Sequence, residues 1–281
     1  MNKNIWWLTG IPDDVAVANT GGRQGAKEGP ARFREMFARL KGPHGVMEQF
    51  HDGGDAECGT DIDKNHQAAA AAITKAASEG SFGVVVGGGH DHAYSHLKGI
   101  KTSMPPGAVL GCINIDPHFD LRKDKPLITS GSPFYMAIEQ QLIAGENLVE
   151  FGIQKHANAP ELWEYARQKQ VHVAPFEEIR LGKAVAAFQT VLNELREKCD
   201  QIVLSLDMDA LQAAFAPGVS APAADGFTPS EILAMMEIAG KAEKIISLGI
   251  YELNPSFDID NQTARLAAVA AYHFAAARIN P

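Results

Sequence analysis

Short apolar runs alternate with helix-like segments along almost the whole chain. Runs such as residues 82–86 (Phe-Gly-Val-Val-Val) are continuously apolar, which is typical of strands buried on both faces of a sheet. Such alternation predicts βαβ units, in which helices cover both faces of a parallel sheet. The pattern predicts strands over residues 5–8, 47–52, 83–86, 109–115, 148–152, 171–173, 202–206 and 244–250, and helices over residues 30–40, 66–77, 92–100, 133–144, 160–169, 183–198, 229–239 and 261–279.

Nothing in this pattern marks a second domain. The 281 residues are enough to bury a large core, and no Pro/Ser-rich linker, internal repeat or low-complexity tract divides them. We therefore predict one domain over residues 1–281, an α/β fold with three layers (αβα) and a central parallel sheet of about eight strands. Pro30 and Pro229 stand where a first helical turn tolerates proline, and Thr228 is a suitable cap for the second of these helices.

Composition and charge narrow the possible partners. The formal charge of −9 argues against nucleic acids and anionic membranes, both of which need a concentrated basic face. Residues 1–10 hold only a short apolar stretch, so we expect no signal peptide, and no later run is long enough to span a membrane. The three scattered cysteines fit reduced thiols and lack the spacing of a zinc site. We therefore expect a cytoplasmic protein.

Residues suited to one chemical site follow several of the predicted strands. In open α/β sheets, ligands bind beyond the carboxyl ends of the strands. A glycine run at 87–89 leads directly to a histidine, the strand at 109–115 leads into Asp-Pro-His-Phe-Asp, and the strand at 202–206 leads into Asp-Met-Asp. The candidate residues at these ends are His90, Asp116, His118, Asp120, Asp207, Asp209 and, after the last strand, Glu252.

Spacing and charge suggest why these residues occur together. If the chain stays extended, positions 116, 118 and 120 point to one side, as do positions 207 and 209. Buried unpaired carboxylates repel each other and are costly to desolvate, and divalent cations remove that cost. Six Asp and His ligands exceed what one ion needs, which favours two ions with bridging carboxylates. The carboxylate majority and the absence of Cys ligands favour Mn²⁺ over structural Zn²⁺.

At these motifs the chain resembles the ureohydrolase family of arginases, agmatinases and formimidoylglutamases. The matching segments are GGGH at 87–90, NIDPHFDLR at 114–122, SLDMDALQAAFAPGVSAPAADG at 205–226 and YELNP at 251–255, and the resemblance spans almost the whole chain. It implies a three-layer α/β fold, two Mn²⁺ per subunit and hydrolysis of a guanidino or amidino C–N bond in a small molecule. It also implies a homo-oligomer, either a trimer or a hexamer.

The resemblance also implies a role for each site residue. His90, Asp116, Asp120 and Asp207 would bind one manganese, and Asp116, His118, Asp207 and Asp209 would bind the other, so that Asp116 and Asp207 bridge the ions. Glu252 would pair with the cationic C–N group of the substrate through charge-assisted hydrogen bonds. The predicted catalytic residues are Glu252 and Asp120. Hydroxide, available because two divalent charges lower the pKa of water, would attack the amidine carbon.

Two departures from the arginase and agmatinase pattern indicate the substrate. Those enzymes usually carry a Ser-Gly-x-x-His segment, whereas residues 130–134 here are Ser-Gly-Ser-Pro-Phe, and Leu211-Gln212-Ala213 replaces the frequent Leu-Asp-Pro. Both departures resemble the formimidoylglutamase branch, which hydrolyses N-formimidoyl-L-glutamate to L-glutamate and formamide in histidine degradation. We therefore expect substrate contacts from Arg122, whose planar fork suits a carboxylate, and from Ser130, Asn158 and Glu252.

Several alternatives stay open at this point. The chain could be a different ureohydrolase that releases urea from agmatine or guanidinobutyrate, or a non-catalytic metal-binding protein on the same fold. Arg122 could instead pair with a loop acid. His92 and Asp91 could touch the site or belong to a helix start, and Asn158 and Gln154 could bind the substrate or cap a helix. The group that protonates the leaving amine is not identified.

Overall fold

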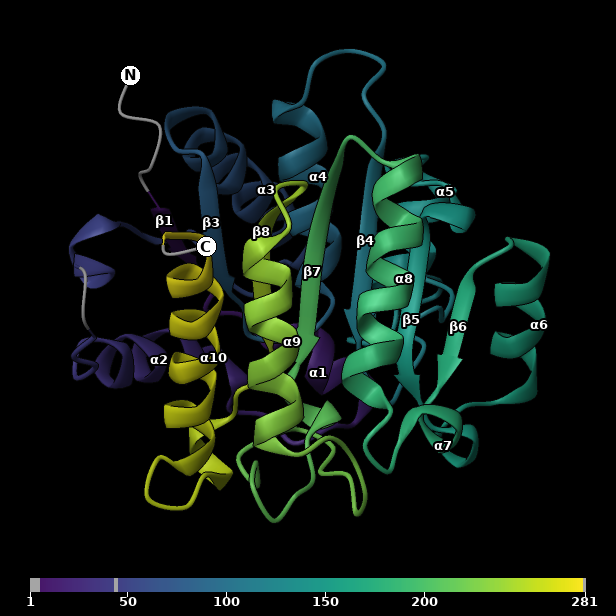
Figure 1. Cartoon of the computed structure of the whole chain (residues 1–281). Coiled ribbons are helices and arrows are strands. Elements are labelled where there is room, and N and C mark those ends of the chain that lie inside the picture. Colours follow the sequence, from purple (N-terminus) through teal and green to yellow (C-terminus); the bar gives the residue numbers. More distant parts are fainter. Residues whose placement is uncertain (1–5, 43–44, 280–281) are drawn as a thin grey trace.

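Eight parallel strands form one sheet in the order β2-β1-β3-β8-β7-β4-β5-β6 (Figure 1). The computed structural model describes residues 6–42 and 45–279. This sheet confirms the predicted α/β class, while residue 5 of the first predicted strand lies outside the described residues. The strands are β1 (Trp6–Gly10), β2 (Phe50–Asp55), β3 (Phe82–Val86), β4 (Leu110–Ile115), β5 (Leu148–Ile153), β6 (His172–Pro175), β7 (Gln201–Asp207) and β8 (Ile245–Tyr251).

Helices cover both faces of this sheet. Alternate residues of the strands point to opposite faces and pack there into two separate hydrophobic clusters. One cluster takes in the helices at the front of Figure 1, and the other takes in α3, α4 and α5 behind the sheet together with α6. The front helices are α2 (Gly29–Phe37), α8 (Ala184–Lys198), α9 (Pro229–Lys241) and α10 (Gln262–Ile279), and the others are α3 (Ile62–Glu79), α4 (His92–Ser103), α5 (Pro133–Glu139) and α6 (Pro160–Gln168).

The predicted helix starts at proline are confirmed. Pro30 lies in the first turn of α2, and Thr228 caps α9 in a reciprocal capping box with Glu231. Other boundaries differ from the prediction. Helix α3 begins four residues early because Asp61 accepts a hydrogen bond from the Lys64 N–H, and α5 ends five residues early.

The sequence pattern did not reveal the shortest elements, which lack room for a helical period. These are the helices α1 (Val15–Thr20) and α7 (Phe176–Ile179), and the 3₁₀ turns η1 (Ala26–Glu28), η3 (Met47–Gln49), η4 (Gly145–Asn147), η5 (Lys155–Ala157), η6 (Met208–Ala210) and η7 (Pro255–Phe257). Turn η3 occupies the start of a predicted strand, so that β2 begins only at Phe50. Within the described residues, every helix is too short or too polar to cross a bilayer.

The sheet order brings the predicted chemistry together. Strands β3, β8, β7 and β4 are neighbours at the centre of the sheet, although β3 and β4 follow each other in the chain. All are parallel, so their carboxyl ends lie along one edge. Each of these four strand ends carries one of the predicted site segments, so the four segments lie next to one another at this edge of the sheet.

Candidate metal centre

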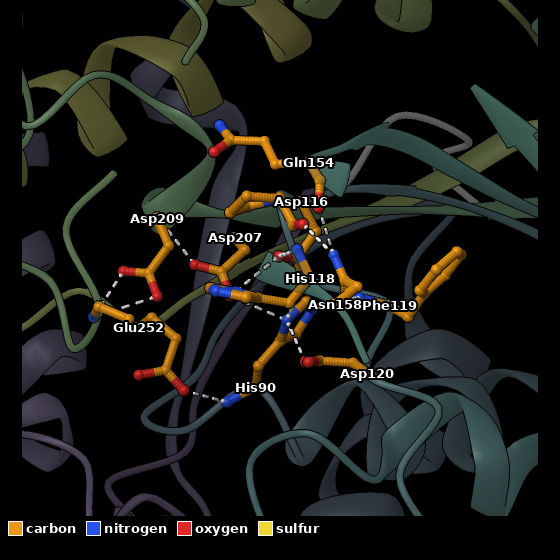
Figure 2. Close-up of polar contacts among 12 residues, drawn as sticks. His90, Asp116, His118, Phe119, Asp120, Gln154, Asn158, Asp207, Asp209 and Glu252 are labelled. Atoms are coloured by element: carbon orange, nitrogen blue, oxygen red, sulfur yellow. Dashed lines mark hydrogen bonds and ion pairs between the residues drawn. The ribbon is translucent and has the colours of Figure 1, made fainter. Parts of the chain in front are cut away.

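Four of the predicted ligands meet in a buried cluster. The Nδ1 atom of His90 lies 2.9 Å from Oδ2 of Asp116, 3.0 Å from Oδ2 of Asp120 and 3.0 Å from Oδ2 of Asp207 (Figure 2). These ligand atoms all lie within 4.8 Å of one another, and all four residues are buried. Three parallel strands therefore aim one imidazole and three carboxylates at a common point.

The hydrogen bonding of His90 supports a cation at that point. Its Nε2 lies 2.8 Å from Oγ of Ser205, whereas the buried Nδ1 has no hydrogen-bond partner in spite of the three nearby carboxylates. A histidine that binds a metal typically donates its other ring N–H in this way and turns its lone pair to the ion. Ligands at right angles around an ion about 2.1 Å away lie about 3 Å apart, which matches the observed spacings. The donor set fits a hard divalent cation.

His118 and Asp209 complete the predicted six, at the edge of this cluster. The Nδ1 atom of His118 lies 3.3 Å from Oδ1 of Asp116, and the His118 side chain is about a quarter exposed. Asp209 is buried, and its two carboxylate oxygens each lie 3.2 Å from the Ala221 N–H. Neither residue belongs to the compact four-residue cluster. The ligands predicted for the second ion are therefore spread more widely than those predicted for the first.

The local backbone differs from the extended form that we expected. Strand β4 ends at Ile115, and Oδ1 of Asp116 accepts a hydrogen bond from the His118 N–H at 2.7 Å. In the same way, Oδ1 of Asp207 accepts from the Asp209 N–H at 2.7 Å, where η6 begins. These are Asx-type turns, so the expectation of an extended chain over residues 116–120 and 207–209 was wrong. The side chains converge because Asp116 and Asp207 each accept a hydrogen bond from the backbone N–H two residues later, which turns the loop that follows each strand.

Two predicted site residues adopt a backbone conformation that favours glycine. Asp120 has φ 51° and Glu252 has φ 61°. A non-glycine residue in this region costs about 1 kcal/mol or more, and such residues cluster at functional sites. At Glu252 the turn is held by a hydrogen bond from its N–H to the Gly88 carbonyl at 2.9 Å.

A cavity of about 100 Å³ opens onto these residues. Glu252 lies in its wall and is buried, with Oε1 accepting a hydrogen bond from the His90 N–H at 2.8 Å (Figure 2). Its other oxygen, Oε2, has no partner in the described structure. Burial, followed by the charge of Asp207, raises the pKa of Glu252 to about 8. An unpaired buried carboxylate oxygen at a cavity wall suits a cationic N–H donor.

Comparison with known proteins agrees with this geometry. The family model described as "Arginase family" matches residues 6–276. The chain belongs to the arginase family. It is 34% identical over 270 residues to a formimidoylglutamase of Geobacillus thermodenitrificans, covering 94% of this chain and 83% of that protein, and 34% identical over 275 residues to one of Hahella chejuensis, covering 95% and 84%.

A solved structure of the family has the same fold. The crystal structure of Trypanosoma cruzi formiminoglutamase with Mn²⁺ superposes with a TM-score of 0.88 at 29% identity, covering 99% of this chain and 94% of that one. The predicted family membership and the arginase-type fold are therefore confirmed.

Arg122 and Ser130 line the cavity, as predicted for substrate contacts. Among the described residues, the Arg122 guanidinium makes no hydrogen bond or ion pair, and the alternative pairing with a loop acid is therefore not observed. Its side chain runs along Gly131, where an added Cβ would lie 2.9 Å from the Arg122 Cδ. Ser130 shares a hydrogen bond with Thr20 of α1, with the two hydroxyl oxygens 3.0 Å apart.

Asn158 lies elsewhere than the prediction placed it. Its Oδ1 accepts from the Phe119 N–H at 2.9 Å, and its Nδ2 donates to the carbonyls of Pro117 and Gln154 at 2.8 and 2.9 Å (Figure 2). The amide thus binds within the loop that carries three of the predicted metal ligands, and it does not line the cavity. Gln154 also lies away from the cavity and donates to the Asp225 carbonyl at 2.7 Å.

His92 and Asp91 form hydrogen bonds behind the centre and do not line the cavity. The Nε2 of His92 lies 2.9 Å from Oδ2 of Asp13, and Oδ2 of Asp91 lies 2.8 Å from Nε2 of His66 on α3. All four residues are buried. The first pair connects the segment that follows His90 to the β1–α1 loop, and the second connects it to α3.

Two aromatic rings pack against the His90 imidazole. Tyr251 stacks on it with ring centroids 4.9 Å apart, and Phe134 meets it edge-on at 5.8 Å. Phe134 thus packs behind a predicted metal ligand, in the segment where the resemblance led us to expect a histidine. The sequence analysis gave no role to Tyr251 or to Ser205, although Ser205, a polar residue within the buried run of β7, was a signal that could have been read.

Arg23 was also missed. It donates hydrogen bonds to the carbonyls of Pro217, Val219 and Ser220, and its guanidinium lies over the ring of Phe257, 4.1 Å from the centroid. These hydrogen bonds hold the loop at residues 217–220. The residue that follows this loop, Ala221, donates its backbone N–H to Asp209. In the sequence, this arginine stands out only as a cation in a glycine-rich segment.

Protein stripped of metal is expected to lose stability as the pH rises from 6 to 9. Burial lowers the pKa of His118, but Asp116 outweighs it and raises the value to about 10, while the pKa of Glu252 is about 8. Both exceed the values of the unfolded chain, so folding takes up protons and the stabilisation is lost as the pH rises through these values. Thermal unfolding in chelator at pH 6 to 9 measures this.

The same experiment with saturating Mn²⁺ is the control. Metal binding displaces the protons, so the metal-loaded protein should hold its melting temperature over this range while the apparent metal affinity rises with pH. A chelated protein that is more stable at pH 9 than at pH 6 would contradict these assignments.

Proposed function

We propose that this protein hydrolyses the amidine C–N bond of N-formimidoyl-L-glutamate with one water molecule, giving L-glutamate and formamide, and that it acts in histidine degradation. The observation that carries the proposal is the pairing of opposite charges in one small cavity. Glu252 offers an unpaired carboxylate oxygen at one side, and Arg122 offers an unpaired guanidinium at another. A substrate with a cationic amidine and carboxylates complements both. The formimidoylglutamases among the relatives support the same substrate.

We also propose that two Mn²⁺ ions are the cofactor, as in the trypanosomal relative. His90, Asp116, Asp120 and Asp207 would hold one ion, and Asp116, His118, Asp207 and Asp209 the other. When bound, such a pair of ions lowers the pKa of water enough to supply a nucleophile near neutral pH. The hydrogen bonds described above hold these side chains in place, and Asn158 fixes the loop that carries three of them.

The residues of the chain then orient the substrate. Glu252, ionised beside a cationic partner, would receive the amidinium N–H groups and place the planar carbon beside the carboxylate cluster. Arg122 would hold a substrate carboxylate at the more exposed side of the cavity, and Ser130 would offer a hydroxyl there. Most of the ligand side chains are buried, so bulk water is kept from the reacting carbon. A cytoplasmic location, expected from the scattered cysteines, and a trimeric or hexameric assembly, expected from the resemblance, stay predictions.

A parallel substrate assay tests this proposal. Manganese-loaded protein would be incubated with N-formimidoyl-L-glutamate, agmatine, arginine and 4-guanidinobutyrate, and formamide and urea would be measured separately. We expect formamide from the first substrate, with the other three at least about 100-fold poorer in kcat/KM, because agmatine and arginine bring a cation to Arg122 and guanidinobutyrate has one carboxylate fewer. Urea release from a guanidino substrate at a higher rate would replace this proposal with the other ureohydrolase activity.

Glu252→Gln is expected to lower kcat/KM by about 100-fold or more, because the neutral amide cannot form a charge-assisted pair with an amidinium. The glutamine oxygen still accepts the hydrogen bond from the His90 N–H, so bound manganese should stay near the wild-type amount. Steady-state kinetics and metal analysis of the same preparation check both statements. Unchanged kcat/KM would remove Glu252 from the substrate site.

A further inference from the structure

A buried carboxyl group outside the proposed ligand set lies on β5. Glu150 is completely buried and pairs in register with Asn114 of β4, which is also completely buried. The Asn114 Nδ2 donates to Oε2 of Glu150 at 2.9 Å and lies 3.3 Å from Oδ2 of Asp116. Asn114 is in turn the register partner of Ser205 on β7, whose hydroxyl contacts His90. One row of polar residues across the sheet thus leads to two of the proposed ligands.

Two oxygen atoms of this row lack partners. Both Oε1 of Glu150 and Oδ1 of Asn114 are buried, and neither has a hydrogen-bond partner in the described structure. Two buried acceptors without a donor, one of them on an ionised group, would be a costly arrangement in a water-free interior. A single proton on Oε1 changes this, because a carboxylic acid O–H can donate to an amide carbonyl while the amide N–H donates back.

The surroundings of Glu150 favour the proton. Among the described residues, no Lys, Arg or His forms an ion pair with it. The nearby carboxylates of Asp116 and Asp120 favour the neutral acid and outweigh the opposing charge of His90. Burial, together with these charges, raises the pKa of Glu150 well above its ordinary value. Asp116 also selects the orientation of the amide, since the reverse orientation would place the Asn114 oxygen against the Asp116 carboxylate.

We infer that Glu150, as a neutral carboxylic acid, forms a two-hydrogen-bond pair with the Asn114 amide, and that this pair positions Asp116, the proposed bridging ligand. Glu150 is a positioning residue and does not touch the substrate. The inference rests on the proposed function for the importance of Asp116, while the amide–acid pair itself requires neither metal nor substrate. Outer-shell residues of this kind typically change metal affinity about 10- to 100-fold when they are removed.

The test compares Glu150→Gln with Glu150→Leu. Glutamine reproduces a neutral acid, since its NH₂ donates to the Asn114 oxygen and its carbonyl accepts from the Asn114 N–H. Leucine leaves both polar groups of Asn114 without this partner. Manganese affinity, measured by competition with a chelating dye, should stay within about twofold for the glutamine variant and weaken about tenfold or more for the leucine variant. Equal weakening in both variants would overturn the inference, because an ionised Glu150 is not replaced by an amide.

Infrared spectroscopy provides an independent readout on metal-free protein. The wild type minus Glu150→Gln difference spectrum should contain the C=O stretching band of a protonated carboxyl group, and the band should be absent when the exposed, ion-paired Glu139 is changed to Gln. A band from an ionised carboxylate in its place would overturn the inference, even if the leucine variant did not fold. Neither measurement involves turnover, so a failure to hydrolyse formimidoylglutamate would disprove the proposed function and leave this inference standing.

Discussion

Replacing Asp207 with alanine is expected to abolish turnover and to remove most of the bound manganese. Asp207 is buried at the end of β7, with Oδ2 3.0 Å from the His90 Nδ1, and its Oδ1 holds the turn that carries Asp209. The substitution would therefore take a shared ligand from both ions and loosen a second one. We expect a loss of kcat/KM of about 1000-fold or more, beyond the 10- to 100-fold typical of outer-shell changes.

Two controls separate this effect from general destabilisation. Asp207→Asn keeps an oxygen that can accept from the Asp209 N–H but loses the charge, so it should fold normally and still bind metal poorly. Asp63→Ala, at an exposed position in the first turn of α3, should leave both metal content and activity unchanged. Metal analysis, circular dichroism and the formamide assay are required on all three variants. Near-normal turnover of Asp207→Ala would refute the bridging assignment.

The sequence predicted the sheet well because its strands are buried on both faces. Continuous apolar runs such as that of β3 have few other interpretations, and their alternation with helices leaves a parallel sheet as the consistent solution. Boundaries were less predictable where local hydrogen bonds decide them. The Asp61 cap extends α3 beyond its apolar period, and the turn η3 shortens β2.

The site was predictable in its residues and less so in its shape. Six Asp and His residues at strand ends are hard to explain without cations, and the structure draws four of them into one cluster. The Asx turns that aim them, the stacking of Tyr251 on His90 and the partner of Asn114 depend on which strands are neighbours. That order is not written in any local stretch of sequence. Asn158 was predicted to contact the substrate because it is a polar residue near the site, but its side chain binds the backbone of a loop instead.

Arg122→Met is expected to raise KM for N-formimidoyl-L-glutamate about 10-fold, with metal content unchanged. A charge-assisted hydrogen bond to a carboxylate contributes about 1.5–3 kcal/mol when desolvated, and the exposure of Arg122 places the effect at the lower end of that range. Methionine retains much of the apolar stem that packs along Gly131, so the cavity wall should persist. Lys123→Met, which removes the adjacent exposed cation outside the cavity lining, is the matched control and should change neither constant.

The substrate itself supplies the sharper control. If Arg122 holds one carboxylate, the variant should be impaired only on substrates that possess it. Formimidoyl derivatives of 4-aminobutyrate and norvaline each lack one of the two carboxylates of glutamate, so one of them should be turned over equally by wild type and variant. That equality would identify the carboxylate that Arg122 binds, because removing either partner of a pair leaves nothing for the second removal to disrupt. A uniform loss on all three substrates would instead mean that Arg122 supports the cavity wall, and an unchanged KM would place it outside the substrate site.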